Sequence, residues 1–462
     1  MSSEFAMRLP LPMGGQSYPI PTAARPDAHT KGGLTMELRR RSWVAGLALA
    51  GLAYGQFSGE FVFVKSTLAT GGQVASGPQV PGGPATIEEV AVEPADDPND
   101  ICTIWKNNEP ARAALQASVT EIAMRDVVNK QIAPGASVTV GCGKNILATA
   151  VAGTDGVGNN LSASETQYDI ASLSKMFTAA GILRLHEEGK LNIDEPVGKF
   201  LPSWNSGAKA SVTFRQLLQH RSGLVDPQYS TIVAGTSSPD QVNAKVQAFQ
   251  LTNAPDAVHK YSNLGYTVVY DAASIAAGQP LSAYIKANIL NPLDMTKTGI
   301  AGEVNNCAPT SPDNDKSAVL TCVPQDELAR NQGGVSGHAG WFTTPEDIGK
   351  FMAATANRGS LNGRSILLAA TIDAQRQAQP GENYGIGVRT NGSKKFSTLM
   401  SAEAFGHTGW NGIGAFVDPT TKLWSAEFMN GTFHRTGPAG LSYIFIRNVN
   451  DRLVTATNAL PR

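Results

Sequence analysis

Net charge and long apolar runs are both missing from this chain. Lys and Arg number 37 against 38 Asp and Glu, so there is no basic excess of the kind that binds nucleic acid. No apolar stretch reaches the roughly 18 residues that a membrane-spanning helix needs. Whole-chain disorder is also excluded, because 42% of the residues are hydrophobic and only 16% are charged. The 462 residues allow two or three domains, or one large core with a tail.

Cysteine is scarce, and its spacing does not favour a metal. The four cysteines are Cys102, Cys142, Cys307 and Cys322. They form no C-x-x-C motif and have no histidine cluster beside them, so we expect neither a metal nor an organic cofactor. Cys307 and Cys322 flank a polar loop, which favours a disulfide in an oxidising compartment. Four buried free thiols are the alternative.

Residues 36–55 have the layout of a secretory signal peptide. Three arginines from Arg39 to Arg41 precede an apolar stretch from Trp43 to Tyr54, and small residues follow before Gln56. We therefore expect export to the periplasm or the medium, with a short buried helix as the alternative. The predicted organisation is an N-terminal extension and signal peptide over 1–55, a flexible Gly- and Pro-rich linker over 56–110, and one folded domain over 111–462.

Hydrophobic periodicity predicts an α/β (α+β) domain. A helical pattern covers 111–130, and two strands over 136–142 and 146–152 flank a turn. An amphipathic helix is expected over 173–188. Further helices are expected at 214–220, 267–277, 282–289, 345–354 and 441–453, and late strands at 384–389, 412–417 and 423–429. This order predicts a mainly antiparallel sheet built from both ends of the chain, flanked by helices, with a helical insertion between.

The strongest chemical signal is Ser172-Leu173-Ser174-Lys175. Positions i and i+3 share a helical face, so Ser172 Oγ and Lys175 Nζ can form a hydrogen bond. A serine is a nucleophile only when a base takes its proton, and a lysine with a lowered pKa is such a base. The pattern alone is weak, because Ser206-Gly207-Ala208-Lys209 repeats it. We interpret that second copy as a solvated loop.

A second element is Tyr261-Ser262-Asn263. A tyrosine beside the lysine can pass a proton to a leaving group, and an asparagine amide can orient both the lysine and a substrate carbonyl.

The third element is His407-Thr408-Gly409, which leads into a predicted strand. Gly409 would allow a close approach of the backbone to the substrate. The N–H groups of Trp410 and Ser172 are candidates for an oxyanion hole, and the Trp410 side chain for either the acyl pocket or packing. Lys297-Thr298-Gly299 and Arg435-Thr436-Gly437 are alternative third elements, but neither leads into a predicted strand.

These three elements, in this order, resemble the serine β-lactamase and penicillin-binding superfamily. The Tyr-x-Asn form resembles the class C branch, with its family VIII carboxylesterases, DD-peptidases and D-aminopeptidases. Four surrounding stretches resemble the family as well: 217–224, 261–269, 291–299 and 333–348. The resemblance covers about residues 111–462 and implies a β-lactamase-like fold with an inserted all-helical subdomain.

The resemblance also implies roles for the motif residues. Ser172 would be acylated, Lys175 and Tyr261 would transfer protons, and Asn263 would hold the substrate. His407, with Thr408 and Gly409, stands where the lactamases usually have lysine. A mostly neutral histidine suits a substrate carboxylate less well, so efficient β-lactam hydrolysis is not expected. His220 and His338, in family-like turns, are expected either to line the cleft or, more simply, to bond nearby backbone.

The sequence therefore predicts a serine hydrolase that acts on a small ester or a D-amino-acid peptide. Short-chain esters are the first expected substrate class, and D-amino-acid peptides are the second. The alternatives are a D-alanyl-D-alanine carboxypeptidase, a D-aminopeptidase, a weak β-lactamase, or a penicillin-binding sensor that is acylated without turnover. An α/β-hydrolase using another serine is disfavoured, because no G-x-S-x-G motif occurs. The sequence assigns no oligomeric state.

Overall fold

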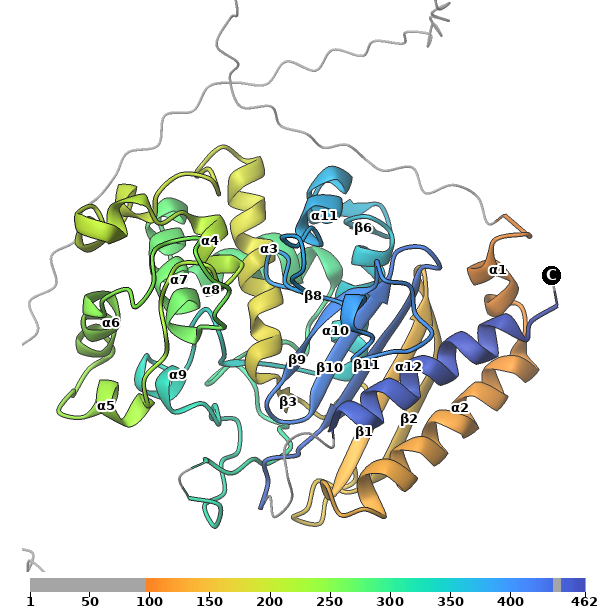
Figure 1. The fold of residues 1–462 in the computed structure, drawn as a ribbon. Helices are drawn as coiled ribbons and strands as arrows, with labels where there is room; N and C mark the ends of the chain where they lie inside the picture. Colours follow the sequence, from red (N-terminus) through yellow and green to blue (C-terminus); the bar gives the residue numbers. More distant parts are fainter. Residues whose placement is uncertain (1–96, 314, 435–441, 462) are drawn as a thin grey trace, which may run out of the picture. The chain divides into compact units, whose positions relative to one another are not determined.

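The computed structural model describes residues 97–313, 315–434 and 442–461 (Figure 1). The predicted signal peptide at 36–55 and the alternative motif that starts at Arg435 lie outside these residues. Among the helices of the described ranges, none is both long and apolar enough to cross a membrane.

A six-stranded antiparallel sheet contains both ends of the domain. Its spatial order is β2-β1-β11-β10-β9-β8, and β1 pairs with β11, so that Ser137 lies opposite Phe428. The predicted assembly from both chain ends is confirmed. The strands are β1 (Gly135–Cys142), β2 (Asn145–Gly153), β8 (Arg389–Thr390), β9 (Phe405–Gly409), β10 (Ile413–Asp418) and β11 (Leu423–Met429).

Helices cover both faces of this sheet (Figure 1). On one face lie α2 (Glu109–Ala123), which continues into a π-helical turn at Met124–Val128, and α12 (Ser442–Asn458). On the other face lie α3 (Ser174–Glu187) and α10 (Pro345–Ala356). Alternate residues of β11 therefore enter two different hydrophobic clusters, and all seven are buried. Because the strand is covered on both faces, even its two polar residues, Ser425 and Glu427, are buried.

The helical insertion packs around α3. Its helices are α4 (Phe214–Leu218), α5 (Tyr229–Val233), α6 (Pro239–Ala248), α7 (Asn263–Ala277), α8 (Leu281–Ile285) with a π-helical turn at Lys286–Leu290, and α9 (Glu327–Asn331). Because the insertion covers one side of α3 and the sheet the other, burial extends around that helix, from Lys175 to Leu183 without a break. The predicted amphipathic character of this helix is therefore wrong.

Smaller elements complete the domain. A three-stranded sheet joins β3 (Tyr168–Asp169), β5 (Trp341–Thr343) and β4 (Gly299–Ile300). β6 (Ser360–Leu361) pairs with β7 (Arg364–Ser365), and α11 (Ala369–Gln375) follows. The strand predicted at 384–389 is reduced to β8, because the chain turns at Gly387, whose φ is +70°. There the backbone passes so close to Ala179 of α3 that a Cβ would clash.

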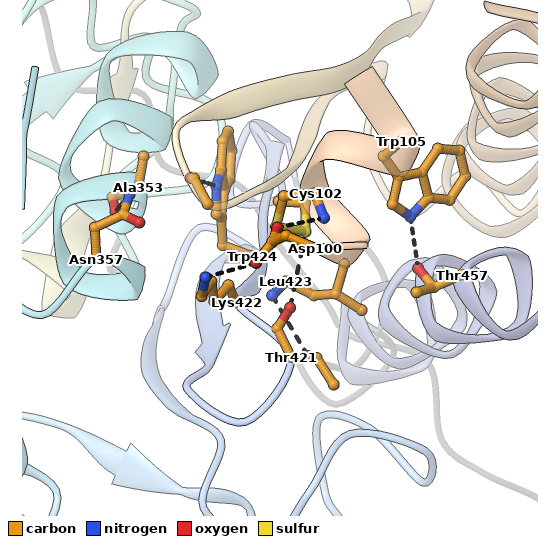
Figure 2. Close-up of a disulfide and its surroundings, with 12 residues drawn as sticks. Asp100, Cys102, Trp105, Ala353, Asn357, Thr421, Lys422, Leu423, Trp424 and Thr457 are labelled. Carbon is orange, nitrogen blue, oxygen red and sulfur yellow. Dashed lines mark hydrogen bonds and ion pairs between the residues drawn. A yellow bond between two sulfur atoms is a disulfide. The ribbon is translucent and has the colours of Figure 1, made fainter. Parts of the chain in front are cut away.

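The folded region begins earlier than the predicted boundary at residue 111. Helix α1 (Ile101–Lys106) starts at the N-cap Asp100, whose side chain accepts a hydrogen bond from Cys102 N. Cys102 forms a disulfide with Cys142 at the end of β1, and the Trp105 indole donates to Thr457 of α12 (Figure 2). The expected linker over 56–110 is thus wrong at its C-terminal end, where these tertiary contacts hold a helix of only two turns.

A second disulfide joins Cys307 to Cys322, as the polar loop between them predicted. No cysteine within the described ranges is free, so the alternative of four free thiols is wrong.

Candidate active site

A cleft with a volume of about 610 Å³ lies where the turn before α3, the insertion and β9 meet. It holds most of the residues that the motifs single out. Seven of the eight predicted site residues line it, namely Ser172, Tyr261, Asn263, His407, Thr408, Gly409 and Trp410. The eighth, Lys175, is buried and bonds to two of them.

Ser172 lies in a single 3-10 turn (Ala171–Leu173) directly before α3. The sequence placed it at the start of an α-helix, and the difference follows from the residue before it. Ala171 has a φ of +45°, a left-handed conformation that a non-glycine residue adopts at a cost. The chain therefore bends sharply at the serine before the regular helix begins.

Lys175 Nζ donates to Ser172 Oγ at 2.9 Å and to Asn263 Oδ1 at 2.7 Å. The predicted i, i+3 contact is confirmed. Burial lowers the pKa of Lys175 to about 7, although the nearby carboxylates Asp326 and Asp226 oppose the shift. A large fraction of this amine is neutral at pH 7, which is the form that accepts a proton.

Tyr261 lines the cleft together with Ser172 and lies close to Lys175. Lys175 Nζ lies 4.8 Å from the centre of the Tyr261 ring, and the His220 ring is 4.2 Å from it, centre to centre. Burial raises the pKa of Tyr261 far above its usual range, and hydrogen bonding with Ser172 opposes this only in part. Tyr261 is therefore a neutral phenol at pH 7, a proton donor and not a tyrosinate.

Asn263 is the first residue of α7, and a buried network fixes it. The carboxylate of Asp226 accepts hydrogen bonds from the N–H of Asn263 at 2.6 Å and from the Ser262 hydroxyl at 2.6 Å. The Asn263 amide nitrogen donates to the hydroxyl of Tyr229. Sequence reasoning missed Tyr229 and Asp226, because each stands alone in the chain with no motif around it.

His407 is 2% exposed, and burial, with the nearby charge of Lys175, lowers its pKa to about 3. Its imidazole is therefore neutral at pH 7. Nδ1 lies 2.6 Å from the carbonyl oxygen of Thr408, so Nδ1 carries the proton. Nε2 is buried and bonds to none of the described residues.

The predicted role of Gly409 needs a physical correction. Its missing side chain makes room for protein backbone, because a Cβ on Gly409 would lie 2.3 Å from the carbonyl oxygen of Ile170. The close approach that the motif indicated thus joins β9 to the turn that carries Ser172.

Arg389 is a cleft residue that the sequence did not reveal. Its guanidinium donates to the Tyr443 hydroxyl at 3.0 Å and lies 5.2 Å from the Tyr384 ring centre. None of the described acidic residues forms an ion pair with it. Arg389 sits at the short edge strand β8, 18 positions before His407 in the printed sequence, a distance at which no sequence pattern links the two.

Trp410 is half exposed at the cleft. Its indole N–H donates to Asp313 at 3.2 Å, and Asp313 belongs to the loop that the Cys307–Cys322 disulfide closes. That loop therefore forms part of the cleft wall.

The alternative motifs lie elsewhere. Lys297 does not line the cleft and pairs with Glu165 at 2.5 Å. Lys209 of the second S-x-x-K copy is not in a solvated loop as expected. It lies in a 3-10 helix (Gly207–Ser211), is 7% exposed and donates to Gln247 O.

Neither of the two turn histidines lines the cleft. His220 Nδ1 accepts from the backbone N–H of Ser262 at 3.1 Å, as the simpler of the two interpretations predicted. His338 instead bonds a side chain, with Nε2 3.0 Å from Asp326 Oδ1.

Comparison with known proteins defines the class. The Beta-lactamase family model matches residues 121–448, which is most of the chain, so the protein belongs to this family. It is a serine hydrolase with a β-lactamase-like fold.

The individual proteins that resemble this chain share less than a third of its sequence. A putative D-alanyl-D-alanine carboxypeptidase of Escherichia coli K12 is 29% identical over 292 residues, covering 56% of this chain and 67% of its own. Two solved structures share the fold. EstCE1, described as a hydrolase with promiscuous acyltransferase activity, has a TM-score of 0.60 and 20% identity over 72% of this chain and 98% of its own. A family VIII carboxylesterase has a TM-score of 0.58 and 20% identity, and the match covers 78% of this chain and 98% of the carboxylesterase chain.

Proposed function

We propose that Ser172 attacks an ester or amide carbonyl and forms an acyl-enzyme that water then hydrolyses. The observation that carries this proposal is the 2.9 Å contact between Ser172 Oγ and the Lys175 amine, whose pKa is about 7. In the neutral amine the contact reverses, and the serine hydroxyl donates to Nζ. As the bond from Oγ to the carbonyl carbon forms, the serine proton passes to Lys175.

Tyr261 is proposed to protonate the leaving group. It is a neutral phenol in contact with Ser172, so it can donate its proton to the departing oxygen or nitrogen and recover one through Lys175. Asn263 holds the lysine amine and orients the substrate carbonyl. The backbone N–H groups of Ser172 and Trp410, both at the cleft, are proposed to stabilise the oxyanion. Water then attacks the acyl carbon by the reverse proton path, which releases the acid and restores Ser172.

Short-chain carboxylic esters are the proposed first substrate class. The neutral His407 puts no fixed charge in the third motif, and the cleft is rich in aromatic rings, from Tyr229, Tyr261, Tyr384, Trp410 and Tyr443. An uncharged ester needs no counter-charge and gains from such walls. The likeness to EstCE1 and to the family VIII carboxylesterase supports the fold only.

Hydrolysis of p-nitrophenyl butyrate by the wild type and by Ser172→Ala tests this proposal. We expect steady turnover by the wild type and no more than background release by the variant. Ser206→Ala, in the second S-x-x-K copy, is the matched control and should keep full activity. Equal activity of wild type and Ser172→Ala would remove Ser172 as the nucleophile. A burst of one equivalent without turnover would favour the acylated sensor.

Arg389 supports a second candidate, a carboxypeptidase that acts on peptides ending in D-alanine. Its guanidinium faces the cleft without a carboxylate partner among the described residues and matches a substrate carboxylate. The E. coli relative carries the corresponding name.

This candidate is tested with a peptide that ends in D-Ala-D-Ala and with its C-terminal amide. We expect the free acid to be cleaved at least tenfold faster than the amide. Arg389→Gln should remove that preference and keep the rate of p-nitrophenyl butyrate hydrolysis within a few fold of the wild-type rate. Equal cleavage of acid and amide would exclude carboxylate recognition by Arg389.

We also propose that the protein is exported. The supporting observations are the leader-like sequence at 36–55 and the two disulfides, which form in oxidising compartments. Mass analysis of the mature protein is expected to show an N-terminus near Gln56. A mature protein that keeps residues 36–55 would contradict this.

A further inference from the structure

The carboxylate of Asp169 connects the turn before Ser172 to another wall of the cleft. Asp169 lies in β3 and is 2% exposed. Its Oδ1 accepts from the N–H of Ala171 at 2.9 Å, and its Oδ2 accepts from the N–H of Gln325 at 2.6 Å. Ala171 and Gln325 both line the cleft. One buried side chain thus sets the spacing between the nucleophile turn and the segment before α9.

The backbone of the same residue reaches a third wall. The carbonyl oxygen of Asp169 accepts from the Asn411 amide at 2.7 Å, and Asn411 directly follows Trp410. The Asn411 backbone carbonyl in turn accepts from Gly431 N at 2.7 Å. Asp169 is therefore bonded to the turn before Ser172, to the segment before α9 and to the residue after Trp410.

The bond to Ala171 acts where the chain is strained. A φ of +45° at alanine costs on the order of 1 kcal/mol relative to an ordinary conformation. The hydrogen bond from the Ala171 N–H to a buried carboxylate offsets that cost and holds the bend that aims Ser172 into the cleft.

We propose that Asp169 is a positioning residue for the acylation of Ser172, acting through the left-handed turn at Ala171 and through Gln325. This inference rests on the proposed function. Asp169 touches neither Ser172 Oγ nor the cleft, and it moves no proton. It fixes the direction of the serine hydroxyl and the distance to the opposite wall, so its loss should slow the chemical step more than it weakens substrate binding.

A carboxylate is required because both of its oxygens accept from backbone N–H groups. In Asp169→Asn the amide has one oxygen and one NH₂ group, so an N–H donor would face another donor at Ala171 or at Gln325. Burial raises the pKa of Asp169 to about 6, with the two backbone hydrogen bonds opposing the shift. Assays at pH 8 therefore keep the carboxylate ionised in the wild type.

The test is the acylation rate of Ser172 in Asp169→Asn, measured as the burst of p-nitrophenol from p-nitrophenyl butyrate. We expect the rate constant to fall at least tenfold while KM stays within threefold and circular dichroism shows a folded protein. Ser172→Ala serves as the control for the proposed function. If Ser172→Ala keeps wild-type activity, the proposed function fails; if it is inactive but Asp169→Asn acylates at the wild-type rate, only the present inference fails.

Ala171→Gly separates positioning from general stability. Glycine adopts the left-handed turn without strain, so it should lessen the need for the Asp169 bond. We expect Asp169→Asn with Ala171→Gly to recover at least threefold of the lost acylation rate. A double variant that is folded and no faster than Asp169→Asn would overturn the inference. If Asp169→Asn does not fold, Asp169→Glu replaces it in both comparisons, with the same expected loss and rescue.

Discussion

Lys175 and His407 are nitrogen bases at one cleft, and burial lowers the pKa of both. For Lys175 the result is a pKa of about 7, and for His407 a pKa of about 3. The two shifts have different consequences. The lysine becomes a base that changes its charge near neutral pH, whereas the histidine stays neutral throughout the useful range. Of the two groups, only Lys175 therefore changes its charge between pH 5 and 8.

The pH profile of ester hydrolysis should reflect Lys175. Below about pH 7 the lysine is an ammonium and cannot accept the serine proton, so we expect kcat/KM to fall tenfold per pH unit between about pH 7 and pH 6 and to level off above pH 7. His407→Gln is the matched control, because a residue that is already neutral should leave the midpoint in place. A midpoint that moved by more than one unit in His407→Gln would contradict this assignment.

Motif spacing was enough to select the residues that we propose as catalytic, because each motif brings its residues together locally. Ser172 and Lys175 are one helical turn apart, and Tyr261 and Asn263 flank a helix N-cap. Arg389 and Tyr229 were missed for the opposite reason. Each reaches the cleft only through tertiary packing, so nothing beside it in the sequence marks its role.

At the scale of elements, the two disulfides close loops of different kinds. Cys102–Cys142 attaches α1 to the end of β1 and touches no residue of the cleft. Cys307–Cys322 closes the loop whose Asp313 bonds the Trp410 indole. The first is expected to matter for stability alone, and the second for stability and for the shape of the cleft.

Removing each pair should separate these effects. The paired cysteines are 40 residues apart in the first disulfide and 15 residues apart in the second. By loop-closure entropy, these disulfides contribute about 4 and about 3 kcal/mol to the free energy of unfolding. We expect Cys102→Ser with Cys142→Ser to lower the free energy of unfolding in urea by about 4 kcal/mol and to leave kcat/KM unchanged. Cys307→Ser with Cys322→Ser should lower it by about 3 kcal/mol and should also reduce kcat/KM severalfold. An unchanged kcat/KM in the second pair would show that the Asp313 loop does not shape the cleft.

Helices α1 and α3 show which features of an element cannot be predicted from its own sequence. Helix α1 has six residues, too few to produce a periodic pattern, and its stability comes from Cys142 and α12. The apolar stripe of α3 predicts an amphipathic helix, because the elements that pack on its other sides are not visible in the sequence. Thr178, outside that stripe, is instead fully buried.

At the scale of the whole domain, the sheet and the helical insertion share one core. A single buried cluster runs from Trp204 and Leu217 in the insertion, through Phe177 of α3, to Trp424 and Phe428 in β11. Neither part has a separate apolar interior on that side, so neither can unfold without exposing the other.

We therefore expect one cooperative unfolding transition in urea. The fluorescence that Trp204→Phe loses relative to the wild type reports on the insertion side, and the fluorescence that Trp424→Phe loses reports on the sheet side, because each substitution removes one buried tryptophan. The two midpoints should agree with each other and with the loss of esterase activity. An insertion signal that changes at a lower urea concentration than the sheet signal would show two independent units.

The pairing of β1 with β11 also determines when the protein can fold during its synthesis. Ser137 is made early and its partner Phe428 almost last, with the whole insertion between them. The β1–β2 hairpin therefore leaves the ribosome with an open edge and with apolar residues on both faces, and it has no strand to pair with until translation is nearly complete. The sheet cannot be completed until the last strands have been made, a property that suits the proposed export through a narrow secretion channel.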